Sequence, residues 1–152
     1  TAIPTVYADD YNFEIGKAVT LQSGVKIALI ATGVTMVSEA MKTAKQLEET
    51  IGIKCTVVNM HTIKPIDAEC ITSLAENHDI LVTIEEHNTI GGLGSAVAEV
   101  VGRKKHNCRQ VFIGINDTNF KMGSRQYMLN QAGLTSEHMF EKIAKEVGEL
   151  HD

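Results

Sequence analysis

Short apolar runs alternate with amphipathic stretches along this 152-residue chain, and that alternation restricts the fold more than any other feature. Four runs are apolar enough to form strands that are covered on both faces of a sheet. They are residues 25–31, 55–60, 80–84 and 110–115. Between them, apolar residues recur at steps of three and four, which is typical of helices with one buried face. The alternation predicts a mainly parallel α/β sheet with helices on both faces.

The helical segments carry recognisable end signals. Thr35 is the expected N-cap of the first helix, and Gly52 is expected to end it. A second helix is expected to begin after Pro65, because proline favours the first helical turn. Three further helices are predicted over residues 93–101, near residues 127–131, and after Thr135 as N-cap.

The first twenty residues follow a looser pattern. Residues 1–12 are mixed and polar, and we interpret them as a linker. Residues 13–21 alternate weakly and are expected to form an antiparallel edge strand that Gly16 interrupts.

The composition excludes several classes of protein. Apolar residues make up 43% and charged residues 22%, the balance of a globular domain. No apolar run reaches the roughly 18 residues that a membrane span needs, and no signal peptide is recognisable. Three cysteines without close pairing indicate a reducing environment, so a cytoplasmic location is expected. The net charge is −5, and the one basic cluster, residues 103–105, falls at an expected helix end, so nucleic-acid binding is disfavoured.

A glycine-rich segment, residues 91–94, is the first candidate site. The N-terminus of a helix presents backbone N–H groups that can bind an anion. A dinucleotide-binding fingerprint requires a third glycine, however, and Val97 stands at that position. We therefore favour a tight turn or a close packing contact over a phosphate site.

Glu85, Glu86 and His87 form the second candidate, at the carboxyl end of a predicted strand, where open α/β sheets place functional groups. Because successive strand residues point to opposite faces, Glu85 and His87 are expected to share one side. A carboxylate beside an imidazole could act as acid and base. No second cluster completes such a constellation, and His106 and Cys108 lack further ligands at zinc spacing. The residues therefore indicate an interface or loop-anchoring role, with no catalytic, cofactor-binding or metal site.

Five sequence blocks in this order resemble the C-terminal domain of transketolases. They are FEIGKA (13–18), ATG (31–33), TIKPID (62–67), TIEEHNTIGGLGSAVAE (83–99) and D-x-x-F-x-x-G (117–123), the last followed by AGLT (132–135). Transketolases, 1-deoxyxylulose-5-phosphate synthases and the β subunits of 2-oxo acid dehydrogenases share this domain. The resemblance covers residues 13–147 and implies a three-layer α/β/α sandwich with a mixed, mostly parallel sheet of about five strands. It makes residues 1–12 the linker from a preceding domain and residues 13–152 the domain itself.

The resemblance also implies a division of labour within the enzyme. In this family, thiamine diphosphate and Mg bind between a diphosphate-binding and a pyrimidine-binding domain, usually across a dimer interface. The metal–diphosphate motif begins Gly-Asp-Gly, and no Gly-Asp-Gly occurs in this sequence. The chain is therefore expected to provide scaffold and interface in a homodimeric enzyme that transfers a ketol unit between sugar phosphates, and to be inactive alone. The residues expected to contact the pyrimidine-binding domain or subunit are Glu85, Glu86, His87, Gly91, Gly92 and Gly94.

Two alternatives remain open from the sequence. His87 and the run G-G-L-G-S-A-V look most like transketolases that are split into two subunits, whereas 1-deoxyxylulose-5-phosphate synthases commonly carry Asn or Gly at the position of His87. The C-terminal domain of such a synthase is the nearer alternative. The other is a free-standing flavodoxin-like binding or signalling module, for which residues 32–35 offer only a weak phosphate loop.

Overall fold

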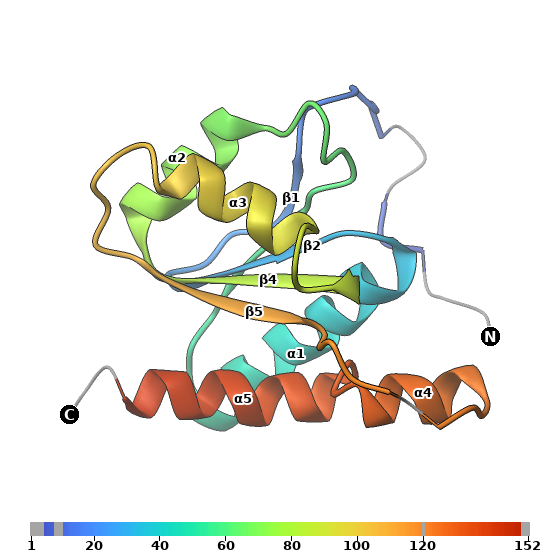
Figure 1. The fold of residues 1–152 in the computed structure, drawn as a ribbon. Coiled ribbons are helices and arrows are strands. Elements are labelled where there is room, and N and C mark those ends of the chain that lie inside the picture. The colour runs from blue at the N-terminus through green and yellow to red at the C-terminus, as the bar shows by residue number, and fades with distance from the viewer. Residues whose placement is uncertain (1–4, 8–10, 120, 150–152) are drawn as a thin grey trace.

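The computed structural model describes residues 5–7, 11–119 and 121–149, and within them strands and helices alternate as expected (Figure 1). The strands are β1 (Val19–Gln22), β2 (Lys26–Ala31), β3 (Thr56–Asn59), β4 (His78–Asn88) and β5 (Arg109–Ile115). The helices are α1 (Val34–Ile51), α2 (Ala68–Asn77), α3 (Leu93–Val101), α4 (Arg125–Gln131) and α5 (Ser136–Gly148). Within the described ranges, no helix is both long and apolar enough to cross a bilayer.

The five strands form one mixed sheet in the order β1-β3-β2-β4-β5. β1 is antiparallel to β3 at one edge, and all other neighbours are parallel, which confirms the predicted sheet. From β2 the chain passes to β3 on one side and then crosses to β4 on the other. The carboxyl ends of β2 and β4 therefore flank a topological switch point, the usual ligand crevice of open α/β sheets. We call the end of the molecule where the parallel strands terminate the carboxyl edge.

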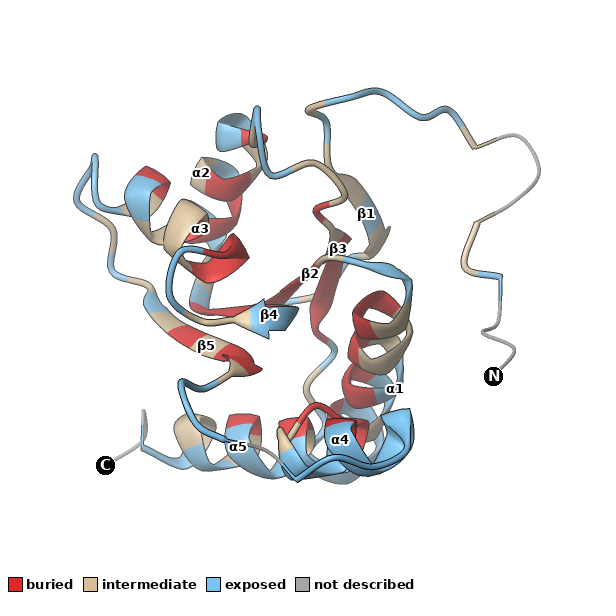
Figure 2. Cartoon of the chain, turned by 45° about the vertical axis from the view of Figure 1, so that its right-hand side comes forward, coloured by how far each residue is buried: buried red, intermediate tan, exposed pale blue. Residues whose placement is uncertain are grey.

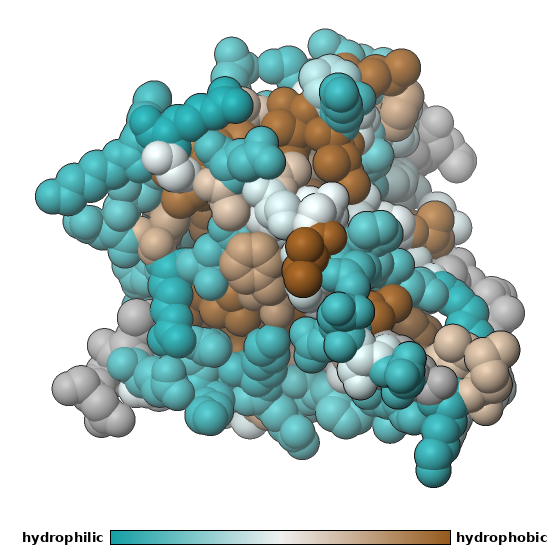
Figure 3. Space-filling view, viewed as in Figure 1, coloured by the Kyte–Doolittle hydropathy of each residue, from teal (hydrophilic) through white to brown (hydrophobic). Residues whose placement is uncertain are grey.

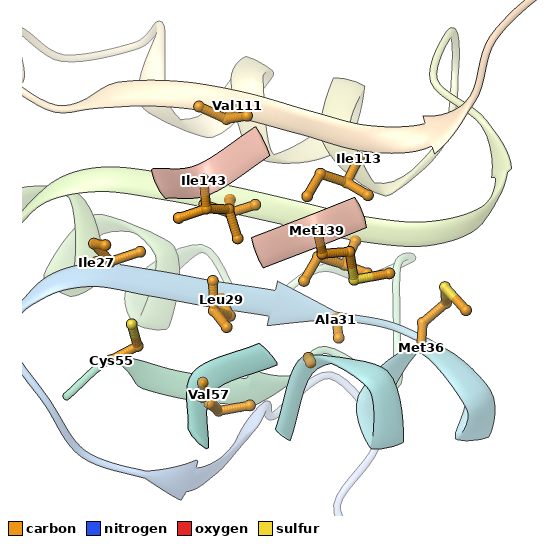
Figure 4. Packing of buried hydrophobic residues seen from close by; sticks show 14 of the residues in the cluster. Ile27, Leu29, Ala31, Met36, Cys55, Val57, Val111, Ile113, Met139 and Ile143 are labelled. Carbon is orange, nitrogen blue, oxygen red and sulfur yellow. The ribbon is translucent and has the colours of Figure 1, made fainter. Parts of the chain in front are cut away.

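Helices cover both faces of the sheet, which confirms the three-layer α/β/α sandwich. α2 and α3 lie on one face, and α1, α4 and α5 lie on the other (Figure 1). Alternate residues of β2 serve the two faces: Ile27 and Leu29 pack in the cluster towards α1 and α5 (Figure 4), and Ala28 and Ile30 in the cluster towards α2 and α3. This double burial explains why the parallel strands appear in the sequence as continuous apolar runs.

The predicted N-cap of α1 is wrong. The cap position is occupied by Gly33, whose φ of 83° lies in a region that favours glycine, and the helix begins at Val34. Thr35 already lies in the first turn, and its hydroxyl instead accepts a hydrogen bond from Arg125. The predicted end of the helix at Gly52 is confirmed.

The other helix starts agree with the sequence signals. α2 follows Pro65, and the Asp67 carboxylate caps it by accepting from the Cys70 N–H at 3.0 Å. Thr135 is the N-cap residue of α5, but its hydroxyl contacts the His138 Nδ1 at 2.9 Å and no backbone N–H.

The predicted first strand is too long. The Lys17 N–H donates to the Glu14 carbonyl in a turn, and the Ala18 N–H donates to the Asp67 carboxylate, so this backbone is not available for strand pairing. β1 consequently begins only at Val19. Of the predicted linker, residues 5–7 and 11–12 form neither helix nor strand, and residues 1–4 and 8–10 lie outside the described residues. The division into linker and domain stays a prediction.

Candidate functional site

The candidate residues Glu85, Glu86 and His87 lie near the end of β4, at the carboxyl edge of the sheet, which comes forward in Figure 2. The pleat of the strand separates them as expected. Glu85 and His87 point towards α3, with 3.9 Å between the His87 Nδ1 and the Glu85 Oε2. Glu86 points to the opposite face, towards α4, where it pairs with Arg125.

The Glu85 carboxylate caps the N-terminus of α3. Its side chain is buried, and its two oxygens accept from the N–H groups of Leu93 and Gly94, each at 2.7 Å. The first N–H groups of a helix have no partner inside the helix and carry the positive end of its dipole, so a carboxylate is stabilised there. The anion at this helix N-terminus is therefore a side chain of the protein itself.

The glycines of the loop are required by this close approach. A Cβ atom on Gly92 would lie 1.9 Å from the Glu85 Oε2, and one on Gly94 would lie 2.3 Å from the Phe112 ring. Gly91 has open space around it but a φ of +81°, which side chains rarely tolerate. The loop thus combines a tight turn with close packing. This agrees with the sequence, in which Val97 replaces the third glycine of a dinucleotide-binding fingerprint.

Arg125, at the start of α4, closes the switch point. Its guanidinium donates to the Glu86 carboxylate at the end of β4 and to the Thr35 hydroxyl, at 2.9 Å, in the first turn after β2. One side chain therefore spans the two strand ends between which open α/β sheets bind their ligands. Sequence reasoning missed Arg125, because no local pattern links it to two residues that far along the chain.

A mainly apolar hollow of about 340 Å³ lies beside this bridge, between α4 and the ends of β4 and β5. Its walls are formed by Glu86, Ile115, Gly123, Arg125, Met128, Leu129, Ala132 and Leu134. Glu86 and Arg125 are the charged residues among them, so the hollow combines an apolar lining with one acid–base pair.

Comparison with known proteins places these features in a family. The family model of the transketolase C-terminal domain matches residues 16–139. The chain belongs to the transketolase C-terminal domain family. It is 40% identical over 139 residues to a putative transketolase C-terminal section of Methanocaldococcus jannaschii, covering 91% of this chain and 42% of that protein. It is 35% identical over 129 residues to the 1-deoxy-D-xylulose-5-phosphate synthase of Histophilus somni, covering 85% of this chain and 20% of the synthase.

A solved structure agrees with the family assignment. The structure described as a split gene transketolase, inactive beta4 tetramer, superimposes with a TM-score of 0.87 and 37% sequence identity. The superposition covers 95% of this chain and 46% of that one. The chain spans less than half the length of all three proteins.

Backbone groups engage both members of the Glu85–His87 pair in this transketolase C-terminal domain. Both Glu85 oxygens are engaged by backbone N–H groups, and the His87 Nδ1 lies 2.9 Å from the Asn88 carbonyl oxygen. No group of three or more His, Cys, Asp or Glu residues in the described ranges could hold a metal ion.

Two of the three cysteines of the domain are poor nucleophiles. Burial raises the pKa of the Cys55 thiol to about 12 and that of Cys70 to about 11. Since the thiolate is the reactive form, both side chains stay unreactive at neutral pH.

Proposed function

We propose that this chain is the C-terminal portion or subunit of a thiamine-diphosphate-dependent, transketolase-type transferase that moves a ketol unit between sugar phosphates. Within that enzyme it supplies scaffold and interface, and another domain or subunit supplies the catalytic groups. The family assignment supports the enzyme class and favours it over a free-standing flavodoxin-like module. The chain covers less than half the length of these relatives, which supports the existence of a second domain or subunit that completes the enzyme.

One observation supports a non-catalytic role for this chain: a side chain of the protein itself occupies the anion-binding position of the glycine loop. The Glu85 carboxylate occupies the N-terminus of α3, where a dinucleotide-binding sheet holds a pyrophosphate. The Arg125 bridge spans the switch point in the same way. A substrate phosphate would have to displace a buried carboxylate, so the fold uses this edge for structure and contact.

The residues of this chain do not fit thiamine diphosphate or its magnesium ion. A diphosphate–magnesium site needs carboxylate or carbonyl ligands around the metal. No suitable cluster is present among the described residues, and the sequence has no Gly-Asp-Gly. In the proposed enzyme the cofactor is held by the diphosphate-binding and pyrimidine-binding domains, and no step of the reaction is assigned to side chains of this chain.

The glycine loop is the proposed contact with the pyrimidine-binding domain or subunit. Glu85 holds it from beneath through α3, and His87 in β4 and Ile90 just before the loop are exposed. Of the six residues expected at this contact, Glu86, His87 and Gly91 are exposed and can touch the partner, whereas Glu85, Gly92 and Gly94 are buried and shape the loop from within. A homodimer of the complete enzyme and a cytoplasmic location complete the proposal, and the three free cysteines support a reducing compartment.

Ketol transfer with thiamine diphosphate and magnesium tests the proposal. We expect transfer from a ketose phosphate only when this chain is combined with the part that carries the cofactor-binding domains. The related structure described as "split gene transketolase, inactive beta4 tetramer" supports the expectation that the chain is inactive alone. Transfer by this chain alone would overturn the division of labour.

The 35% identity to a 1-deoxy-D-xylulose-5-phosphate synthase supports that synthase activity as a second candidate function. The same combined preparation is therefore assayed for formation of 1-deoxy-D-xylulose 5-phosphate. Formation of that product without ketol transfer would assign the chain to the synthase branch of the family.

A further inference from the structure

The outer edge of β5 is an unpaired edge of the sheet. In the described part of the chain, β5 pairs with β4 alone, so its other side has no neighbouring strand. The Ile115 carbonyl accepts from the first residue after β4, whereas the Phe112 carbonyl accepts from Lys142 on the outer side. Because successive strand residues direct their backbone groups to opposite sides, Gln110, Phe112 and Gly114 direct theirs outwards.

Little else in the described ranges occupies this edge. Apart from the Lys142 contact, no hydrogen bond within those ranges reaches the outward backbone groups of Gln110, Phe112 and Gly114. A hollow of about 390 Å³ lies along the edge, beside the side chains of Lys142 and Glu146 of α5. β5 runs between α3 and α5 (Figure 1), and the space-filling view from the same side shows brown and tan side chains between the levels of these two helices (Figure 3).

The two edges of the sheet differ in how well they are suited to pairing. An unpaired edge is a template for another strand, and natural proteins shorten, bend or charge such edges. β1, at the opposite edge, has four residues and an irregular register between Thr20 and Gln22. β5 has seven residues, and residues 110–115 contain neither a charged residue nor a proline. Segments of this composition pair readily with identical copies of themselves, so a second copy of β5 is the strand that this edge fits.

Lys142 places a charge at the middle of this edge. Its ammonium group donates to the Phe112 carbonyl at 2.8 Å, and Phe112 is the central residue of β5. In an antiparallel pairing of two full-length β5 strands, two-fold symmetry would place Phe112 opposite Phe112 of the other copy. The two Lys142 ammonium groups would then lie close to the symmetry axis, where like charges repel and the burial of an ammonium group is unfavourable. Arg109, at the start of the strand, forms an ion pair with Glu146 instead.

We propose that the outer edge of β5 is a strand-pairing surface for a second copy of this chain, and that Lys142 keeps it unpaired. Lys142 does so in two ways: it occupies the Phe112 carbonyl, and it places like charges at the axis of the pairing. Without this charge, two five-stranded sheets can join through β5. The role of Lys142 does not depend on the reaction that the complete enzyme catalyses.

Substitutions of Lys142 in the complete protein test the proposal. Lys142→Met and Lys142→Ala remove the charge, Lys142→Arg keeps it, and Lys145→Met is the matched control that removes a charge from the next turn of α5. Sedimentation velocity over a range of concentrations measures association beyond the wild-type assembly. We expect the Met and Ala variants of Lys142 to associate about tenfold or more tightly than the wild type, and the other two to stay within about twofold of it. Circular dichroism checks folding, and the exposed position of Lys142 leaves the core unchanged.

Amide hydrogen exchange locates the contact. In the wild type, the outward N–H groups of Gln110 and Phe112 should exchange quickly, whereas those of Val111 and Ile113, which face β4, should exchange slowly. In the associated Lys142→Met protein, exchange at Gln110 and Phe112 should become slow, because a second strand then accepts from these groups.

Several results would overturn the proposal. One is unchanged association of both Lys142→Met and Lys142→Ala, and another is tighter association of Lys142→Arg or Lys145→Met to the same degree. Association of the Lys142→Met protein with fast exchange kept at Gln110 and Phe112 would place the contact elsewhere. Slow exchange of these two groups in the wild type would show that the edge is already covered, and the guarding role of Lys142 would be wrong.

Discussion

Replacing Glu85 with glutamine removes one charge from the centre of the site without changing its shape. The wild-type carboxylate offers an acceptor to both Leu93 N–H and Gly94 N–H, each at 2.7 Å. The glutamine amide offers one oxygen and one NH₂ group, so one backbone N–H keeps an acceptor and the other faces a donor. Since the side chain is 2% exposed, water cannot replace the lost bond.

The expected cost follows from these contacts. Leaving one buried N–H without an acceptor costs about 1–3 kcal/mol. Loss of the negative charge at the helix N-terminus adds about 0.3–1 kcal/mol, and up to about 2 kcal/mol in a partly buried geometry. We therefore expect Glu85→Gln to lower the free energy of unfolding by about 3 kcal/mol, a large fraction of the roughly 5–15 kcal/mol of a typical domain.

Urea unfolding of this chain, followed by far-ultraviolet circular dichroism, measures the change. With a slope of about 2 kcal/mol per molar urea, the midpoint should fall by about 1.5 M. Glu86→Gln is the matched control on the next residue, where the carboxylate is in a largely exposed ion pair worth less than about 1 kcal/mol. If Glu85→Gln changed stability no more than Glu86→Gln does, the carboxylate would not be the cap of α3 and the reasoning would fail.

Three further changes probe the same edge and the core. Gly92→Ala places its Cβ against the Glu85 carboxylate and should destabilise by about 2–3 kcal/mol in urea unfolding, whereas Gly91→Ala, strained only by its positive φ, should cost about 1 kcal/mol. Arg125→Ala should lower stability by less than about 1 kcal/mol, so a larger loss in thermal unfolding would show that the bridge supports the core. Alkylation of Cys55 at pH 8 should proceed only through unfolding, and its rate should track stability. Burial raises the pKa of this thiol from 9.0 to about 12, so unfolding between these pH values releases a proton. The contribution of the thiol to stability is therefore lost as the pH rises from 9 to about 12. The Cys55→Ala variant should lack this loss.

The sheet could be predicted because its signals are local. Four apolar runs mark strands that are buried on both faces, and this property depends on composition within a few residues. The shared side of Glu85 and His87 was likewise predictable, since it follows from the alternation of side chains along a strand. The errors lie where a distant side chain satisfies the backbone. Asp67 binds the Ala18 N–H and so shortens the first strand, an effect that the sequence around Ala18 does not contain.

The site was predicted in location but not in its internal bonding. The glycines signalled a close approach, yet the residue that approaches Gly92 could not be inferred, because the same spacing is compatible with a bound anion. Only the folded loop shows that Glu85 fills this position. Arg125 gave no signal at all, since its partners lie on two other elements and its contacts depend on how α4 returns across the sheet.

These contacts explain how this α/β domain can serve as a scaffold, although other open α/β sheets bind ligands at the same edge. The switch point and the helix N-terminus attract anions in any such sheet, because strand order and helix dipoles create both positions. In this chain, Glu85 neutralises the helix N-terminus, and the Arg125–Glu86 pair spans the switch point. Both positions are then filled by the protein's own charged groups, which a phosphate would have to displace.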